Sequence, residues 1–349
     1  MIKLYDVSAL LYMGNSVERP GDDFISENLN GLPVRGLRYA LEQIIAGRTE
    51  NDYTICVMDN KTNKGEFFEG YKSNRTFNNE VFFQRELLRY LIPNLGLPML
   101  SQKQFEADYL FYCFIIDKFL TKSIPSDGIS LYCDDLDLVG CLIDKHIIRY
   151  GLKANTPMIS VDNYPFILHR QGYDIPYNAV LPFILFNGKK SNNLSPIKTE
   201  KGRDCFTSFM RFAKEKYAGK DNLYSLQNLM NAWLVSCQEQ GLYSDNFYNE
   251  INSRMPVVYP RLNWDKSSAL VTKKLDKKVA LNFLTLLQEP KLIRILGMTP
   301  IPEETVDKHL LDKWVSIYRS GTTFVDNYVT ADSTFFFEES DSSGNIGGF

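Results

Sequence analysis

A chain of 349 residues is long for one typical domain and short for three, so one large domain or two is expected. With 44% hydrophobic and 23% charged residues and a formal net charge of −3, it has the composition of a soluble globular protein and excludes a globally basic surface. Any binding to nucleic acid must therefore use a local patch.

The cysteines and the apolar runs limit the class of protein further. The six cysteines form no C-x-x-C pair and only three histidines are present, which argues against a His/Cys zinc site. This usage favours reduced core cysteines in a cytoplasmic protein. No apolar run reaches the roughly 18 residues that a membrane span needs. The opening MIKLYDVSALLY lacks the order of a signal peptide, a basic region before an apolar one.

Short β-like runs alternate with helical patterns in the first part of the chain. Strands are predicted, in chain order, over 2–5, 53–58, 129–133, 147–150 and 158–161. Helices are predicted over 34–47, 79–95 and 106–120, where apolar residues recur at helical spacing or the segment is almost wholly apolar. Strands separated by helices of this length predict an α/β fold with a mainly parallel central sheet flanked by helices.

Helical periodicity dominates after about residue 200, over 206–217, 223–240 and 279–296. We predict an α/β domain over 1–200, a helical region over 201–325 and an acidic, disordered tail over 326–349. A basic cluster precedes the last predicted helix and could contact duplex phosphate, although a solvated helix end explains it equally well: Lys273, Lys274, Lys277 and Lys278. The tail, with TFFFEESD, could dock to a sliding clamp or a single-strand-binding protein, or be a plain chain end.

Three β-like runs end close to an aspartate, at Asp6, Asp59 and Asp135. In an open parallel sheet the carboxyl ends of the strands line one crevice, so these side chains should converge. Glu106 and Asp108 begin a helix and can point into the same crevice. A single aspartate at a strand end is more often a helix cap, but the combined pattern favours a metal site.

A sixth carboxylate, Asp137, follows Asp135 by two residues. So many carboxylates in one pocket repel each other unless cations neutralise them. Ligands that are all oxygen suit Mg²⁺ or Mn²⁺, and the chemistry such a site usually serves is phosphoryl transfer.

The segment EGYKSNR follows the second acidic strand and carries two cations and an aromatic ring. Lys72 and Arg75 could contact a scissile phosphate, and Tyr71 could stack on an unpaired base. A solvated loop is the alternative interpretation.

In this order, the motifs resemble those of the 5′-nuclease family of flap endonucleases and phage 5′→3′ exonucleases, most closely the T-even phage ribonuclease H type. YKSNR corresponds to Y-K-x-N-R, FEADY to E-A-D-D, CDDLDLV to S-x-D-x-D-L, and GKKSNN to G-D-x-x-D-N. The resemblance covers about residues 1–200. It implies a PIN-like fold with a helical arch and a DNA-binding helical region, acting on DNA or RNA–DNA hybrids with a 5′ end or flap.

The resemblance also implies roles for the site residues. Two divalent ions are implied, with Lys72 and Arg75 steadying the scissile phosphate. Asp6, Asp59, Asp108 and Asp135 would hold the first ion, and Glu106 and Asp137 would serve the second ion or its waters.

The chain departs from this pattern at Tyr109, which replaces the last acid of E-A-D-D, and at Lys189 and Asn192, which replace two aspartates. Lys189 would repel a second ion and could pair with Asp137 or Glu106, or substitute in part for the missing charge. Two hypotheses follow. The chain is a metal-dependent 5′→3′ exonuclease or flap endonuclease with an altered second metal site, serving primer removal in phage-like replication. Alternatively, it is a catalytically weakened, structure-specific DNA-binding subunit of a phage replication or transcription assembly.

Overall fold

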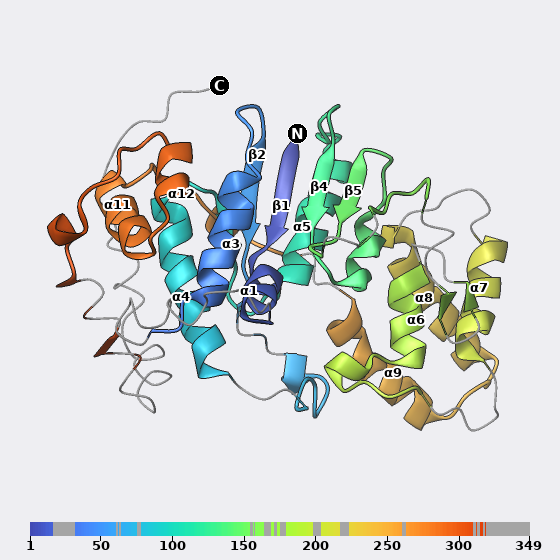
Figure 1. Ribbon diagram of the computed structural model, residues 1–349. Coiled ribbons are helices and arrows are strands. Elements are labelled where there is room, and N and C mark those ends of the chain that lie inside the picture. The colour runs from blue at the N-terminus through green and yellow to red at the C-terminus, as the bar shows by residue number, and fades with distance from the viewer. Residues whose placement is uncertain are drawn as a thin grey trace.

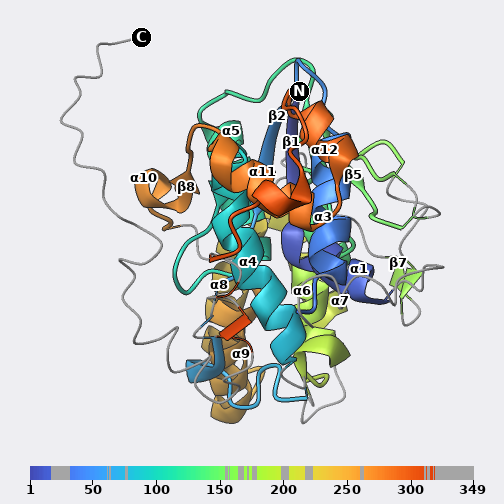
Figure 2. The same cartoon turned by 60° about the vertical axis from the view of Figure 1, so that its left-hand side comes forward.

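The computed structural model of the protein describes residues 1–16, 32–60, 62, 64–74, 78–153, 156, 158–163, 169–170, 173–174, 179–197, 204–216, 223–259, 263–309, 312, 315–316 and 318. Figures 1 and 2 show it from two directions. The predicted acidic tail, residues 326–349, lies outside these residues.

A mixed, mainly parallel sheet forms the centre of the molecule. Its order is β5-β4-β1-β2-β3-β8, and each neighbouring pair is parallel except β3 with β8. The strands are β1 (Ile2–Asp6), β2 (Tyr53–Val57), β3 (Met99–Leu100), β4 (Ile129–Tyr132), β5 (Ile147–Tyr150) and β8 (Leu270–Val271). In Figure 1 the parallel strands β1, β2, β4 and β5 run downward, so their carboxyl ends share the lower edge of the sheet.

Helices cover both faces of this sheet, as parallel sheets require. One face carries α1 (Val7–Ser16), α3 (Arg35–Ala46), α4 (Asn79–Asn94), α11 (Lys277–Leu286) and α12 (Pro290–Ile295). The other carries α5 (Ala107–Leu120), the 3-10 helix η2 (Leu136–Cys141) and α6 (Val180–Asn187). Against α6 pack α7 (Cys205–Lys216), α8 (Leu223–Glu239) and α9 (Asp245–Val258), seen at the lower right of Figure 1.

The smaller elements lie at the edges and connections. They are the helix α10 (Lys266–Ala269), the 3-10 helices η1 (Lys64–Glu66), η5 (Lys190–Asn192) and η6 (Glu303–Thr305), and the separate hairpin of β6 (His169–Arg170) and β7 (Tyr173–Asp174).

The sequence-based boundaries hold for most long elements, with two corrections. The strand predicted over 158–161 forms only an isolated bridge, Arg149 to Ile159. The helix predicted over 279–296 is two helices, because Pro290 cannot continue α11 and instead occupies the first turn of α12. The elements α1, α6, α9, α10, β3, β6, β7 and β8 were not predicted from the sequence.

Residues beyond 200 share their hydrophobic cores with the first part of the chain. In the described residues, one cluster joins Phe209 and Trp233 to the sheet residues Leu4 and Leu131, and the other joins Phe283 to α4. Because β8 also pairs with β3, the boundary at residue 200 is not visible as a separate core and stays a prediction.

The structure bears on two further expectations, the state of the cysteines and the absence of a membrane span among the described helices. All six cysteines are buried and none forms a disulfide, which matches the predicted core role. Among the helices that the structure describes, none is long and apolar enough to cross a membrane.

Candidate active site

The three strand-end aspartates lie at the common carboxyl edge of the parallel strands, as predicted. Asp6 is the last residue of β1, and its Oδ1 accepts a hydrogen bond from the Ala9 N–H at 2.9 Å, which caps α1. Asp59 follows β2, and its Oδ1 accepts from the Ala107 N–H at 2.7 Å, which ties it to the start of α5. These carboxylates are therefore helix caps as well as members of the cluster.

The third aspartate is part of a lysine-centred ion pair. Asp135 Oδ1 accepts from the Asp137 N–H at 3.0 Å at the start of η2. Lys189 Nζ lies 2.9 Å from Asp135 Oδ1 and 3.0 Å from Oδ2, and it also contacts Asp137 Oδ2. The predicted ion pair of Lys189 is confirmed, with Asp135 and Asp137 as partners rather than Glu106.

Burial and charge act oppositely within this ion pair. Burial disfavours the Lys189 ammonium, but Asp137 and Asp135 outweigh it and raise its pKa. Burial also disfavours the Asp135 carboxylate, but Lys189 outweighs this and lowers its pKa. Burial and the neighbouring Asp135 raise the pKa of Asp137 to about 6. Lys189 therefore neutralises one carboxylate well and the second only in part.

The chain reverses sharply just before Lys189. Gly188 has φ 75°, and a Cβ there would lie 2.3 Å from the Leu194 carbonyl oxygen. The backbone of Lys189 then pairs with Leu194 in both directions, at 2.9 and 3.1 Å. Only glycine fits this turn, which aims the next side chain into the crevice.

A second lysine, Lys64, enters the crevice from the other side and was not predicted. Its side chain is 2% exposed, and its Nζ lies 2.6 Å from Glu106 Oε2 and 3.7 Å from Asp108 Oδ2. The ammonium also stands 3.8 Å from the centre of the Tyr109 ring. A lysine in a polar connection carries no periodic pattern. The one available signal for a buried cation was Tyr109, which stands where the family motif has an acid.

The segment carrying the predicted phosphate-contacting residues lies beside the same carboxylate. Lys72 Nζ contacts Glu106 Oε1, and the Tyr71 hydroxyl donates to Glu106 Oε2 at 3.0 Å. Lys72 has φ 54°, a left-handed backbone that is uncommon outside glycine and clusters at functional sites. Arg75 lies outside the described residues. The roles of Lys72 and Tyr71 toward a substrate stay predictions.

Asp6 and Asp108 have too little positive charge nearby to stabilise their ionised forms. Burial and the nearby Asp59, then Asp135 and Asp108, raise the pKa of Asp6 to about 8. Burial and Glu106 raise the pKa of Asp108 despite Lys64. Among the described ion pairs none involves Asp6 or Asp59.

Oxygen donors with excess negative charge fit a hard divalent cation. In the described part of the chain, however, no group of three or more His, Cys, Asp or Glu residues already stands in a metal-holding arrangement. The carboxylates of the crevice thus suit a divalent ion in donor type and charge. Their side chains would have to move closer to one another to bind it.

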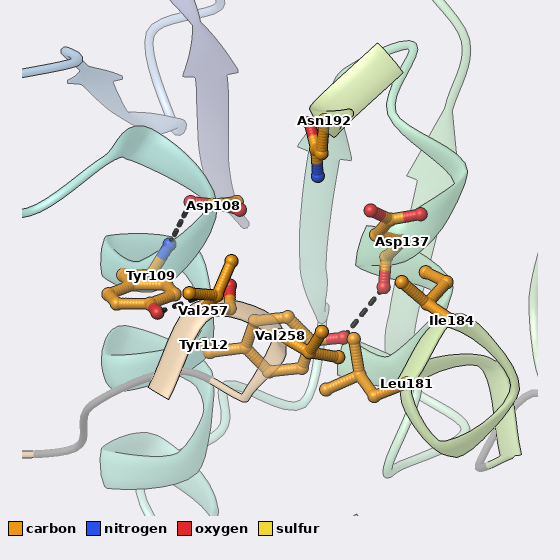
Figure 3. Close-up of a pocket in the computed structure, with 9 residues that line it drawn as sticks. All are labelled: Asp108, Tyr109, Tyr112, Asp137, Leu181, Ile184, Asn192, Val257 and Val258. Carbon is orange, nitrogen blue, oxygen red and sulfur yellow. Dashed lines mark hydrogen bonds between the residues drawn. The ribbon is translucent and has the colours of Figure 1, made fainter. Parts of the chain in front are cut away.

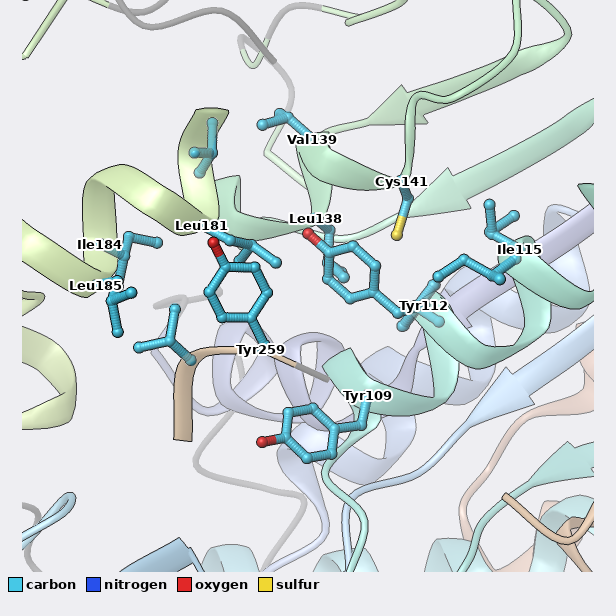
Figure 4. Packing of buried hydrophobic residues seen from close by; sticks show 14 of the residues in the cluster. Tyr109, Tyr112, Ile115, Leu138, Val139, Cys141, Leu181, Ile184, Leu185 and Tyr259 are labelled. Atoms are coloured by element: carbon cyan, nitrogen blue, oxygen red, sulfur yellow. The ribbon is translucent and has the colours of Figure 1, made fainter. Parts of the chain in front are cut away.

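A pocket opens between the two lysine-paired carboxylate groups. Figure 3 shows Asp108, Asp137 and Asn192 around its polar side and Leu181, Ile184, Val257 and Val258 at its base. The Tyr112 hydroxyl donates to the Asp137 carbonyl oxygen at 2.6 Å. Beneath lies the core cluster of Figure 4, where α5, η2 and α6 pack together. This rigid base fixes the start of α5 and of η2, which carry the acids.

The predicted lysine cluster lies away from this crevice. Lys273, Lys274, Lys277 and Lys278 are exposed around the start of α11. The adjacent Asp276 N–H donates to the Asn94 carbonyl oxygen at 2.7 Å, just ahead of β3. The cluster is therefore at the amino edge of the sheet, opposite the carboxylates, and its role in nucleic-acid binding stays a prediction.

Comparisons with known proteins give weak structural likenesses. No protein-family model matches the chain, and no curated protein matches its sequence. The flap endonuclease of bacteriophage T5, solved with DNA and metal ions, is similar with a TM-score of 0.43 and 12% identity, covering 85% of this chain and 99% of that chain.

Two further solved structures are similar at the same level. Human GEN1 with Holliday junction DNA gives a TM-score of 0.46 and 10% identity, over 95% of this chain and 75% of that one. Flap endonuclease-1 from Methanococcus jannaschii gives 0.42 and 14%, over 91% and 93%. At these TM-scores and identities, the function of this chain has to be inferred from its own residues.

Proposed function

We propose that this protein is a divalent-cation-dependent nuclease that hydrolyses phosphodiesters at or near 5′ ends, as a 5′→3′ exonuclease or flap endonuclease. The supporting observation is the meeting of four carboxylates, Asp6, Asp59, Asp108 and Asp135, at the carboxyl edge of three parallel strands and the start of α5. Their excess negative charge is a cost in folding that a bound cation would offset.

Those four carboxylates would hold one ion, Mg²⁺ or Mn²⁺. When bound, such an ion lowers the pKa of water and stabilises charge that develops on a phosphodiester. The second cation position is altered, because Lys189 contacts Asp137 and both carboxylate oxygens of Asp135. Lys189 would contribute a fixed positive charge there.

The chain's other cations would handle the substrate. Lys72 is held beside the crevice by Glu106 and remains 24% exposed, so its ammonium can exchange that carboxylate for a phosphate oxygen. Tyr71 is held by the same carboxylate and would face an unpaired base near the cut. The proposed substrates are DNA or RNA–DNA hybrids with a 5′ end or flap, including the RNA primers of replication.

The test is cleavage of a 5′-labelled DNA flap and a 5′-labelled RNA–DNA hybrid with Mg²⁺ and with Mn²⁺. We expect cleavage that EDTA abolishes, and a loss of about 100-fold or more in Asp135→Asn. Asp134→Asn is the matched control, because the neighbouring Asp134 accepts the Leu152 N–H at 2.8 Å outside the site and an amide oxygen can do the same. Equal cleavage by both variants would contradict the site assignment.

A second candidate function is a structure-specific DNA-binding subunit with weakened catalysis, in a phage replication or transcription assembly. The observation in its favour is that Lys189 bridges two of the six carboxylates and Lys64 contacts two more. Intact flap binding with no cleavage in either metal would select this function over the nuclease.

A further inference from the structure

Lys64 is the site residue that the proposed function leaves unexplained. Its side chain is 2% exposed, and a lysine this deeply buried persists only when its charge is paired. The pairing is with Glu106 at 2.6 Å and, more distantly, Asp108 at 3.7 Å. The lysine therefore belongs electrostatically to the acidic crevice.

The two internal lysines stand on opposite sides of the cluster. Lys189 takes the acids of η2, Asp135 and Asp137, and Lys64 takes those at the start of α5, Glu106 and Asp108. Each brings one positive charge, and together they bring the charge of one divalent ion.

Tyr109 is consistent with this arrangement. Its ring faces the Lys64 ammonium at 3.8 Å, and its hydroxyl donates to the Pro256 carbonyl oxygen. An acid at this position would add a further buried charge, whereas the aromatic face stabilises the ammonium without one.

We propose that Lys64 and Lys189 together supply the charge of a second divalent ion, and that Glu106 and Asp137 are ion-pair partners rather than metal ligands. Lys64 is thereby a positioning residue, because it orients the carboxylate that in turn holds Lys72 and Tyr71. The inference rests on the proposed one-ion nuclease site and adds a second internal cation to it.

The experiment measures Mn²⁺ binding to the full chain by titration with electron paramagnetic resonance of the free ion. Wild type should bind one ion. Lys189→Met should gain a weak second ion, because Asp135 and Asp137 are released while Lys64 still opposes it. Lys64→Met/Lys189→Met should bind that second ion about tenfold more tightly or better, because the remaining repulsion is removed.

Charge and folding are controlled separately. Lys64→Arg/Lys189→Met keeps the charge and should bind the second ion as weakly as Lys189→Met does. If Lys64→Met fails to fold, Lys64→Gln serves, because its amide can still donate to Glu106 without a charge. A second-ion affinity equal in Lys189→Met and the double variant would overturn the inference.

The outcome is independent of cleavage. A chain that cleaves with one ion but shows no effect at Lys64 contradicts the inference alone. A chain that cuts no flap or hybrid contradicts the proposed function, while the binding comparison at Lys64 is still decided.

Discussion

At the scale of single residues, Asp6 shows how the metal-free site disfavours the ionised form of a carboxyl group. Asp6 is the last residue of β1, and its carboxylate caps α1. Burial and the neighbouring Asp59 raise its pKa from 3.8 to about 8. Between these values the folded protein holds a proton that the unfolded chain has lost, so this contribution to stability falls as pH rises.

Asp6→Asn should reveal this cost. The amide oxygen can still cap α1 but does not titrate. In EDTA, we expect the variant to be more stable than wild type at pH 8 and to lose most of that advantage at pH 5. Urea unfolding at the two pH values measures it. A stability difference that is the same at both would show that Asp6 is ionised in the folded state throughout.

Lys189 leads to a prediction about metal-linked stability. Lys189→Met leaves Asp135 and Asp137 facing each other without a cation, which should cost about 1–2 kcal/mol without metal. Added Mn²⁺ should then raise the melting temperature of the variant more than that of wild type, because an ion replaces the lysine. Equal shifts in both would show that the freed acids bind no cation.

The residues of the site differ in how far they could be predicted from the sequence. Asp6, Asp59 and Asp135 could be found because parallel strands end at one edge, and Lys189 because it stands where the resembled motif has an aspartate. Lys64 was not found, since it lies outside every motif of the resemblance and only the fold brings it to Glu106.

At the scale of elements, the two lysine-bearing loops are joined to each other. Asn193 Nδ2 donates to the Gly70 carbonyl oxygen at 2.9 Å and to Ser73 Oγ at 3.0 Å. The Lys72 N–H donates to the Asn192 carbonyl oxygen at 3.1 Å. The loops that hold Lys72 and Lys189 are thereby positioned as one unit.

Asn193→Ala tests this coupling. It removes both side-chain bonds and places alanine at φ 57°, so we expect a loss of about 1–2 kcal/mol and faster hydrogen exchange over residues 70–74. Asn193→Gly removes the bonds but relieves the backbone. Faster exchange in both variants assigns the effect to the bonds; unchanged exchange in both refutes the coupling.

Elements were predictable where periodicity or strand composition was strong, as for α3, β2 and β5. The apolar stretch of α1 carries weak periodicity and follows Asp6 directly, so no turn marks its start. Two-residue strands such as β3 and β8 are too short for any pattern and exist because tertiary contacts pair them.

At the scale of the whole molecule, both sheet faces depend on residues far along the chain. Phe209 and Trp233 complete the core beneath α6, and Phe283 and Leu284 complete the core against α4. Helical periodicity predicted a helical region after residue 200, but could not show that this region closes both cores.

A chain ending at residue 203 should therefore fail to unfold cooperatively, although the sequence suggests a domain boundary there. It loses α7 to α12 and the β8 edge strand, and exposes both apolar faces. A chain ending at residue 320 keeps every described residue and is the control. Calorimetry distinguishes them; a sharp transition in the shorter chain would establish an independent domain.

The most direct test of the central claim is the dependence of single-turnover flap cleavage on Mn²⁺ concentration. A nuclease with one ion and a lysine-filled second position should show cleavage that rises hyperbolically, with an apparent order of about one in metal. Cleavage that rises with the square of the metal concentration would show that two ions are required, and no cleavage at any concentration would show that the site is not catalytic.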